Sequence, residues 1–175
     1  MNNSIRKNVL LSLVLTGALL FDGAVSAFFQ PQLIRSFGTM VPRLTIIVLL
    51  MYSFYLPPKQ VVYFSLVFGF VYDSYYSGVL GLYTAYFTIM TSSVSQIKNI
   101  FFPNMFMIGM VGMISLSAVE TFVYITYQVI SVTNLTMMEF MAQRLGATLI
   151  LNALFFIVFY YPLKKFLSHV LESEI

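Results

Sequence analysis

The chain has 175 residues, of which 59% are hydrophobic, 17% aromatic and only 9% charged, with a net charge of +3. Soluble domains carry about 25% charged residues, so these proportions exclude an ordinary soluble enzyme, a disordered chain and a coiled coil. The nine Lys and Arg residues are too dispersed for nucleic-acid binding, and the absence of cysteine excludes disulfides, thiol nucleophiles and cysteine-based zinc sites.

Six apolar runs have about the length that a membrane-crossing helix needs, which is about 20 residues. In chain order we expect helices at residues 8–29, 43–56, 60–75, 79–97, 103–129 and 138–161. Turn-forming residues separate them at Gln30-Pro31, Pro57-Pro58-Lys59, Ser77-Gly78, Lys98-Asn99 and 131–136. Because the second and third runs are short, a re-entrant hairpin is the alternative to two full crossings. The expected fold is an all-α polytopic integral membrane bundle, with one transmembrane domain over residues 1–175.

Lysine and arginine are distributed unequally between the two ends of these helices. With the N-terminus inside, the cytoplasmic segments hold six of them: Arg6, Lys7, Lys59, Lys98, Lys164 and Lys165. Only Arg35 and Arg43 fall in external segments. Cytoplasmic segments are generally enriched in these residues, so both termini are expected in the cytoplasm, and residues 164–175 add at most a short helical extension.

The first run also has the pattern of a cleavable signal peptide. Arg6 and Lys7 precede the apolar stretch, and Val25-Ser26-Ala27 follows it. We favour a retained first helix.

Six ionisable residues lie within the expected helices or, for Glu139 and Arg43, at their edges. A rise of ~1.5 Å per residue places five of them in the external half: Asp22, Arg43, Asp73, Glu120 and Arg144. They are either structural ion pairs or the lining of an outward-facing polar cavity for a ligand or partner. Glu120 and Arg144, on consecutive antiparallel helices, are expected to pair. Reversing both charges together should then partly restore what either single change breaks.

Small residues mark where helices approach closely in membranes, and the candidates here are Gly23, Ala27, Gly69, Gly109, Gly112, Ala142 and Gly146. Gly78 and Gly81 are expected to form the turn between the third and fourth helices and the start of the fourth. Asp73 either caps that turn, by accepting from backbone N–H groups of the fourth helix, or binds a partner.

No side-chain pattern typical of catalysis is present. The single histidine, His169, lies in the polar tail, and there is no His-Glu-x-x-His, Gly-x-Ser-x-Gly or phosphate-binding glycine loop. Met105, Met107, Met110 and Met113 are expected to pack or face lipid, not to bind metal. We therefore expect no enzymatic activity, no cofactor and no metal site.

Residues 69–84, Gly-Phe-Val-Tyr-Asp-Ser-Tyr-Tyr-Ser-Gly-Val-Leu-Gly-Leu-Tyr-Thr, resemble the central segment of the MreD family of rod shape-determining proteins. In that family a helix ends in a Gly-Phe-x-Tyr-Asp sequence, and a Ser/Thr-Gly turn and a Gly-Leu-Tyr helix start follow. The Val41-Pro42-Arg43-Leu44 start of the second run, the chain length and the six expected helices resemble the version found in Gram-positive bacteria.

This resemblance implies a multi-pass, non-catalytic component of the elongation machinery in the bacterial cytoplasmic membrane. It implies binding to the single-span protein MreC and, through MreC, connection to MreB and the peptidoglycan synthases. The family is also thought to be similar in fold to the substrate-binding subunits of energy-coupling-factor vitamin transporters, so a vitamin-capturing subunit is the alternative function. Those subunits typically have Ala-x-x-x-Ala in the first helix. This chain has Gly23-x-x-x-Ala27, which favours the scaffold.

Overall fold

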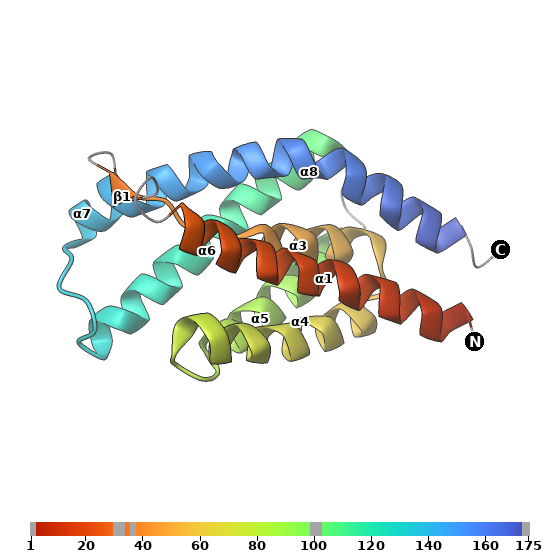
Figure 1. The fold of residues 1–175 in the computed structure, drawn as a ribbon, viewed down its shortest axis with the longest axis horizontal. Coiled ribbons are helices and arrows are strands. Elements are labelled where there is room, and N and C mark those ends of the chain that lie inside the picture. The colour runs from red at the N-terminus through yellow and green to blue at the C-terminus, as the bar shows by residue number, and fades with distance from the viewer. Residues whose placement is uncertain (1–2, 30–33, 36–37, 99–102, 173–175) are drawn as a thin grey trace.

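The protein is an all-α bundle in a computed structural model, which describes residues 3–29, 34–35, 38–98 and 103–172 (Figure 1). In chain order its described helices are α1 (Asn3–Phe28), α3 (Leu44–Tyr55), α4 (Pro58–Tyr72), α5 (Leu82–Ile97), α6 (Met105–Val129), α7 (Met137–Phe140) and α8 (Gly146–Glu172). Two π-helical turns, η1 (Asp73–Ser77) and η2 (Met141–Leu145), extend α4 and join α7 to α8. A two-residue strand β1 (Ile34–Arg35) pairs antiparallel with β2 (Gly38–Thr39) between α1 and α3.

The observed helices match the six expected from the sequence. The ends of α3 and α6 fall within two residues of the predicted ranges. The last helix continues beyond residue 161, through Pro162, to Glu172, because a proline inside a membrane-protein helix removes one hydrogen bond without ending the helix. The predicted breaks at Gln30-Pro31 and Asn99 lie outside the described residues.

Helix α3 is the centre of the bundle. Its sequence, Leu-Thr-Ile-Ile-Val-Leu-Leu-Met-Tyr-Ser-Phe-Tyr, is apolar on all sides, which is typical of a helix with no exposed face. Every residue from Leu44 to Phe54 is buried, and α1, α4, α5, α6 and α8 all contact it. At 12 residues it is only about 18 Å long, against ~30 Å of bilayer hydrocarbon. At least one end of α3 must therefore lie below the membrane surface.

The helices run alternately in opposite directions between two ends of the bundle (Figure 1). Lys98 Nζ at the end of α5 donates to Leu56 O in the α3–α4 turn over 2.6 Å, and Gln60 Nε2 at the start of α4 donates to Asn8 Oδ1 of α1. We call this the lysine end. The start of α1 and the end of α8 lie there too (Figure 1). Because the α3–α4 turn reaches the level of Asn8 and Lys98, α3 and α4 cross the bundle, which favours two crossings over a re-entrant hairpin.

Three of the described helical stretches are long and apolar enough to span a membrane: Ile5–Phe28, Met105–Val129 and Met137–Leu171. Helix α3 is apolar but shorter. The three long helices, α1, α6 and α8, all pack against the short central helix α3, as expected for a polytopic membrane protein.

Several of the predicted small residues lie at close helix contacts. A Cβ at Gly69 would lie 2.6 Å from Thr84 Cα of α5, and one at Gly112 would lie 2.8 Å from Leu50 Cδ2 of α3. A Cβ at Gly109 would lie 3.0 Å from the Phe156 ring of α8, and one at Gly23 would overlap the Tyr76 hydroxyl. At these four positions the absent side chain is what lets the helices approach.

The packing prediction is wrong for the other three small residues. Ala27, Ala142 and Gly146 are exposed, and a Cβ at Gly146 would meet only the Met141 carbonyl of the adjoining turn at 3.8 Å. Spacing along a helix does not show which face of that helix meets a neighbour, so the small-residue pattern alone misplaced them.

Gly69→Ala should destabilise the protein, because its Cβ would meet the α5 backbone, which cannot move aside as a flexible side chain can. Overpacking of this kind costs about 1–3 kcal/mol, and we expect a lower apparent melting temperature in detergent. Gly17→Ala is the matched control: nothing lies within 4 Å of its added Cβ, so alanine should leave stability unchanged or raise it slightly. Equal melting temperatures for the two variants would contradict the close α4–α5 contact.

Candidate functional site

A buried ion cluster lies at the end of the bundle opposite the lysine end. At its centre, Glu120 of α6 accepts from two arginines. Arg43 Nε and Nη2 both lie 2.8 Å from Oε1, and Arg144 Nε lies 3.2 Å from Oε2. Glu120 is fully buried and Arg43 nearly so, whereas the Arg144 side chain is 27% exposed. Such buried charges are tolerated only when each is paired and hydrogen-bonded.

Arg43, immediately before α3, holds three other helices together. Its Nη1 donates to Tyr72 Oη of α4 at 2.5 Å, and its Nη2 donates to Tyr83 Oη of α5 at 2.6 Å. The guanidinium carbon also lies 5.6 Å and 5.0 Å from the centres of these two rings, within cation–π range. Every donor nitrogen of this side chain therefore has a partner, and α4, α5 and α6 all converge on it.

Asp22 of α1 caps the start of α3. Its Oδ1 accepts from Leu44 N at 2.6 Å, and its Oδ2 accepts from Thr45 N at 3.0 Å and Thr45 Oγ1 at 2.8 Å. The first amides of a helix lack intrahelical partners and carry partial positive charge, so a carboxylate there satisfies both. Cleavage after residue 27 would remove this cap, which supports a retained first helix.

Asn152 of α8 clamps the segment that leads into α3. Its Oδ1 accepts from Arg43 N at 2.7 Å, and its Nδ2 donates to Val41 O at 2.8 Å. Thr148, one turn earlier on α8, accepts from Val41 N through Oγ1 at 3.2 Å. Side chains of α8 thus satisfy Val41 N, Val41 O and Arg43 N, whereas Arg43 O accepts from Ile46 N and Ile47 N of α3.

Asp73 caps the α4–α5 turn, as one of the two sequence interpretations predicted. Its carboxylate accepts from Gly81 N at 2.9 Å, Tyr83 N at 2.7 Å, Thr84 N at 3.1 Å and Thr84 Oγ1 at 2.7 Å. Gly78 and Gly81 have φ of +68° and +95°, the left-handed region that glycine adopts readily. Asp73 makes no ion pair among the described residues. Tyr83 links it to the cluster through its backbone N–H and its hydroxyl, and Tyr72, the residue before Asp73, also accepts from Arg43.

A polar cavity of about 250 Å³ adjoins the cluster. Charged and hydroxyl side chains from α1, α4, α5, α6 and the α7–α8 region line it, together with the residue 41–43 segment: Asp22, Ser26, Val41, Pro42, Arg43, Tyr72, Tyr76, Tyr83, Tyr127 and Arg144. Arg144 lines this cavity while bonding to Glu120 through Nε only. Its two terminal nitrogens have no partner among the described residues.

Sequence reasoning found the charged members of the site and missed the neutral ones. Four of the five predicted residues gather around the start of α3. The fifth, Asp73, is connected to Arg43 through Tyr83. Tyr72 and Tyr83 belong to the 69–84 motif but were expected at the membrane interface, not on Arg43, and Thr148 and Asn152 were not singled out. Asn152 and Thr148 had a usable signal, since a polar amide and a hydroxyl four residues apart in an apolar run lie on one helix face.

The position of the cluster follows from helix lengths. Asp22 lies six residues before the end of α1, and Glu120 nine residues before the end of α6. At ~1.5 Å per residue these are depths of about 9 Å and 13 Å. The ion cluster therefore lies about two turns or more below the ends of the longer outer helices.

These features define a class: a polytopic membrane protein whose short central helix begins at a buried ion cluster. The family model for the rod shape-determining protein MreD matches residues 4–170, so the chain belongs to the MreD family and has a role in rod shape determination. The rod shape-determining protein MreD of Bacillus subtilis (strain 168) is 24% identical over 127 residues, which cover 73% of this chain and 74% of that relative. No solved structure matches this chain, so the expected similarity to energy-coupling-factor subunits stays a prediction.

The structure changes the expected outcome of charge reversal. Glu120→Arg combined with Arg144→Glu would place the new arginine against Arg43, so the double reversal should not rescue protein level.

Glu120→Gln should cost about 3–5 kcal/mol, because Arg43 would lose its counter-ion while buried. Arg144→Gln should cost less, because water reaches that side chain. Glu139→Gln, in the exposed capping box at the start of α7, is the matched control and should be near neutral.

The measurement is the amount of folded protein and its melting temperature in detergent. If the double reversal restored wild-type stability, Glu120 would pair with Arg144 alone and the Arg43 contact would be of no consequence.

Proposed function

We propose that this chain is a non-catalytic scaffold of the bacterial cytoplasmic membrane that helps to determine rod shape by binding MreC and thereby organising lateral peptidoglycan synthesis. Membership of the MreD family supports the role in cell shape. The observation that carries the binding proposal concerns Arg144. It bonds to the cluster through Nε only, is partly exposed, and lines the polar cavity.

The chemistry of Arg144 defines what the partner must offer. A guanidinium can only donate hydrogen bonds, so the partner has to supply acceptors, such as a carboxylate or free backbone carbonyls. Bonds to a charged group contribute about 1.5–3 kcal/mol. A partner segment that reaches the cavity would complete the hydrogen bonding of Arg144 and so contact the ion cluster directly.

The carboxylates of the site support a structural role over a catalytic one. Asp22 accepts three bonds, Asp73 accepts four and Glu120 is held by two arginines. A general base must be able to approach a substrate and accept its proton, whereas these three carboxylates are buried and already bound to backbone amides, hydroxyls or arginines. The chain's single histidine, His169, lies near the end of α8, at the far end of the bundle.

We also propose that the lysine end faces the cytoplasm, with both termini there. Lys59 and Lys98 both lie at this end, and α8 carries Lys164 and Lys165 towards it. Lysine-rich ends of membrane helices remain on the cytoplasmic side. The cluster and its cavity then open towards the outside, where peptidoglycan is assembled.

Reporter fusions test this orientation. Fusions after Lys59, after Lys98 and at the C-terminus should all report the cytoplasm, and a fusion near residue 132 should report the outside. A reporter at Lys59 on the side opposite to one at Lys98 would contradict both the orientation and the α5-to-turn contact.

Co-purification tests the binding proposal. The tagged full-length chain is co-expressed with MreC of the same genome and purified in mild detergent. MreC should be retained by the wild type and by Lys59→Gln, an exposed lysine at the other end, and reduced roughly tenfold by Arg144→Gln, in line with the loss of one charged interaction. Retention unchanged in Arg144→Gln would show that MreC binds elsewhere. No retention by the wild type would refute MreC binding itself.

Depletion separates the scaffold from the vitamin-capturing alternative. Loss of a scaffold should give wide or round cells, whereas loss of a vitamin transporter subunit should give vitamin auxotrophy with normal shape. The cavity of about 250 Å³ lies below the ~300–1,000 Å³ of typical small-molecule pockets, which supports the scaffold.

A further inference from the structure

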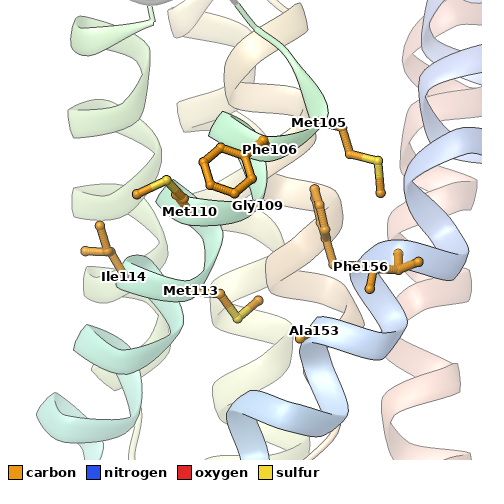
Figure 2. A pocket seen from close by; sticks show the side chains of 9 residues that line it. Met105, Phe106, Gly109, Met110, Met113, Ile114, Ala153 and Phe156 are labelled. Atoms are coloured by element: carbon orange, nitrogen blue, oxygen red, sulfur yellow. The ribbon is translucent and has the colours of Figure 1, made fainter.

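A second cavity, of about 610 Å³, lies between α6 and α8 in the half of the bundle nearer the lysine end. Figure 2 shows Phe156 of α8 lying between the two helices, with the Met105 and Met113 side chains of α6 extending towards α8. Gly109, Ala153 and Ile157 also line it, and every lining side chain is apolar. An apolar groove open to hydrocarbon takes an apolar chain.

The same face of α8 continues from this groove into a basic site. At 100° per residue, positions 153, 157, 161, 164 and 168 fall within an arc of about 80°. A separate cavity of about 320 Å³ is lined by Tyr161, Lys164, Lys165 and Ser168. The Lys164 ammonium lies 6.0 Å from the centre of the Tyr160 ring. Two cations, a hydroxyl and an exposed tyrosine thus stand at the mouth of the groove.

We infer that α6 and α8 form a binding site for an anionic glycerophospholipid, whose phosphate lies at Lys164 and Lys165 and whose acyl chain lies in the α6–α8 groove. This inference does not depend on MreC binding. Basic pockets beside membrane helices bind anionic head groups, and tyrosine suits the membrane interface.

The dimensions fit one leaflet. Ala153 and Lys164 are 11 residues apart on α8, or about 17 Å, and the groove-lining part of α6 from Met105 to Ile114 covers about 14 Å. Half of a bilayer's hydrocarbon thickness is about 15 Å. A chain that follows the groove from a phosphate at the lysines therefore reaches the middle of the bilayer.

The lining favours a lipid chain over a partner helix. Close packing of membrane helices relies on small residues that let backbones approach. Here seven of the nine lining residues are large, three of them methionines, and Phe156 already covers Gly109, with the ring 3.0 Å from where a Cβ would be. Methionine fills irregular apolar gaps readily, which suits a mobile acyl chain.

Native mass spectrometry of the purified full-length chain tests the site, with phosphatidylglycerol and phosphatidylcholine as probes. The wild type should bind phosphatidylglycerol roughly thirtyfold more tightly, since Lys164 and Lys165 each contribute about 1 kcal/mol towards an anionic surface. Lys164→Gln combined with Lys165→Gln should remove this preference. Ala153→Phe should weaken binding of both lipids by filling the groove.

Two controls match these variants. Lys59→Gln removes a lysine at the same end of the bundle, away from α8. Ile89→Phe enlarges an exposed apolar side chain of α5. Both should bind lipid as the wild type does. If Ala153→Phe does not fold, Met113→Phe fills the same groove and takes its place.

Three results would overturn the inference: equal binding of the two lipids by the wild type, a phosphatidylglycerol preference that survives the double lysine substitution, or lipid binding unaffected by filling the groove. Competition by soluble glycerol phosphate as effective as by the lipid would show that only the head group is bound. Loss of MreC together with unchanged lipid binding in Ala153→Phe would show that the groove holds a partner helix.

Discussion

Glu120 is the carboxylate on which two arginines converge, and the arrangement of the bundle depends on that convergence. Arg43 reaches it from the start of α3 while donating to tyrosines of α4 and α5, and Arg144 reaches it from the helix that follows. Removing Glu120 would leave Arg43 buried without a counter-ion, which costs several kcal/mol. The ion cluster therefore links helices that apolar packing alone would allow to slide, since lipid and leucine are equally apolar.

The shortness of α3 explains why polar side chains gather at its first residue. A helix of 12 residues cannot reach both membrane surfaces, and its first backbone amides are buried within the bundle, so they need partners from the protein. Asp22 supplies the acceptors for those amides, and Asn152 supplies partners for the backbone just before them. Polar side chains from α1 and α8 thus take the place of solvent at the point where α3 starts.

The two ends of the protein offer different chemistry to the cell. At the cluster end, Arg144 has donors with no partner among the described residues and lines a small polar cavity, which supports recognition of a protein segment. At the lysine end, α8 carries two adjacent lysines beside an apolar groove, which supports recognition of a lipid. The η2 turn and α8 are continuous, so they connect the two ends of the bundle physically.

The sequence by itself determined the membrane class, the six helices and the opposite placement of lysines and ion cluster, because these depend on local composition, turn residues and rise per residue. For Asp73 it left two interpretations, and the structure shows the cap of the α4–α5 turn. The sequence did not determine that Glu120 serves Arg43 as well as Arg144, that Asn152 clamps residues 41–43, or that Ala27, Ala142 and Gly146 face outwards. Those facts depend on how each helix is rotated about its axis. Rotation is decided only when all the helices pack around α3, and a one-dimensional pattern carries no information about which neighbour each face meets.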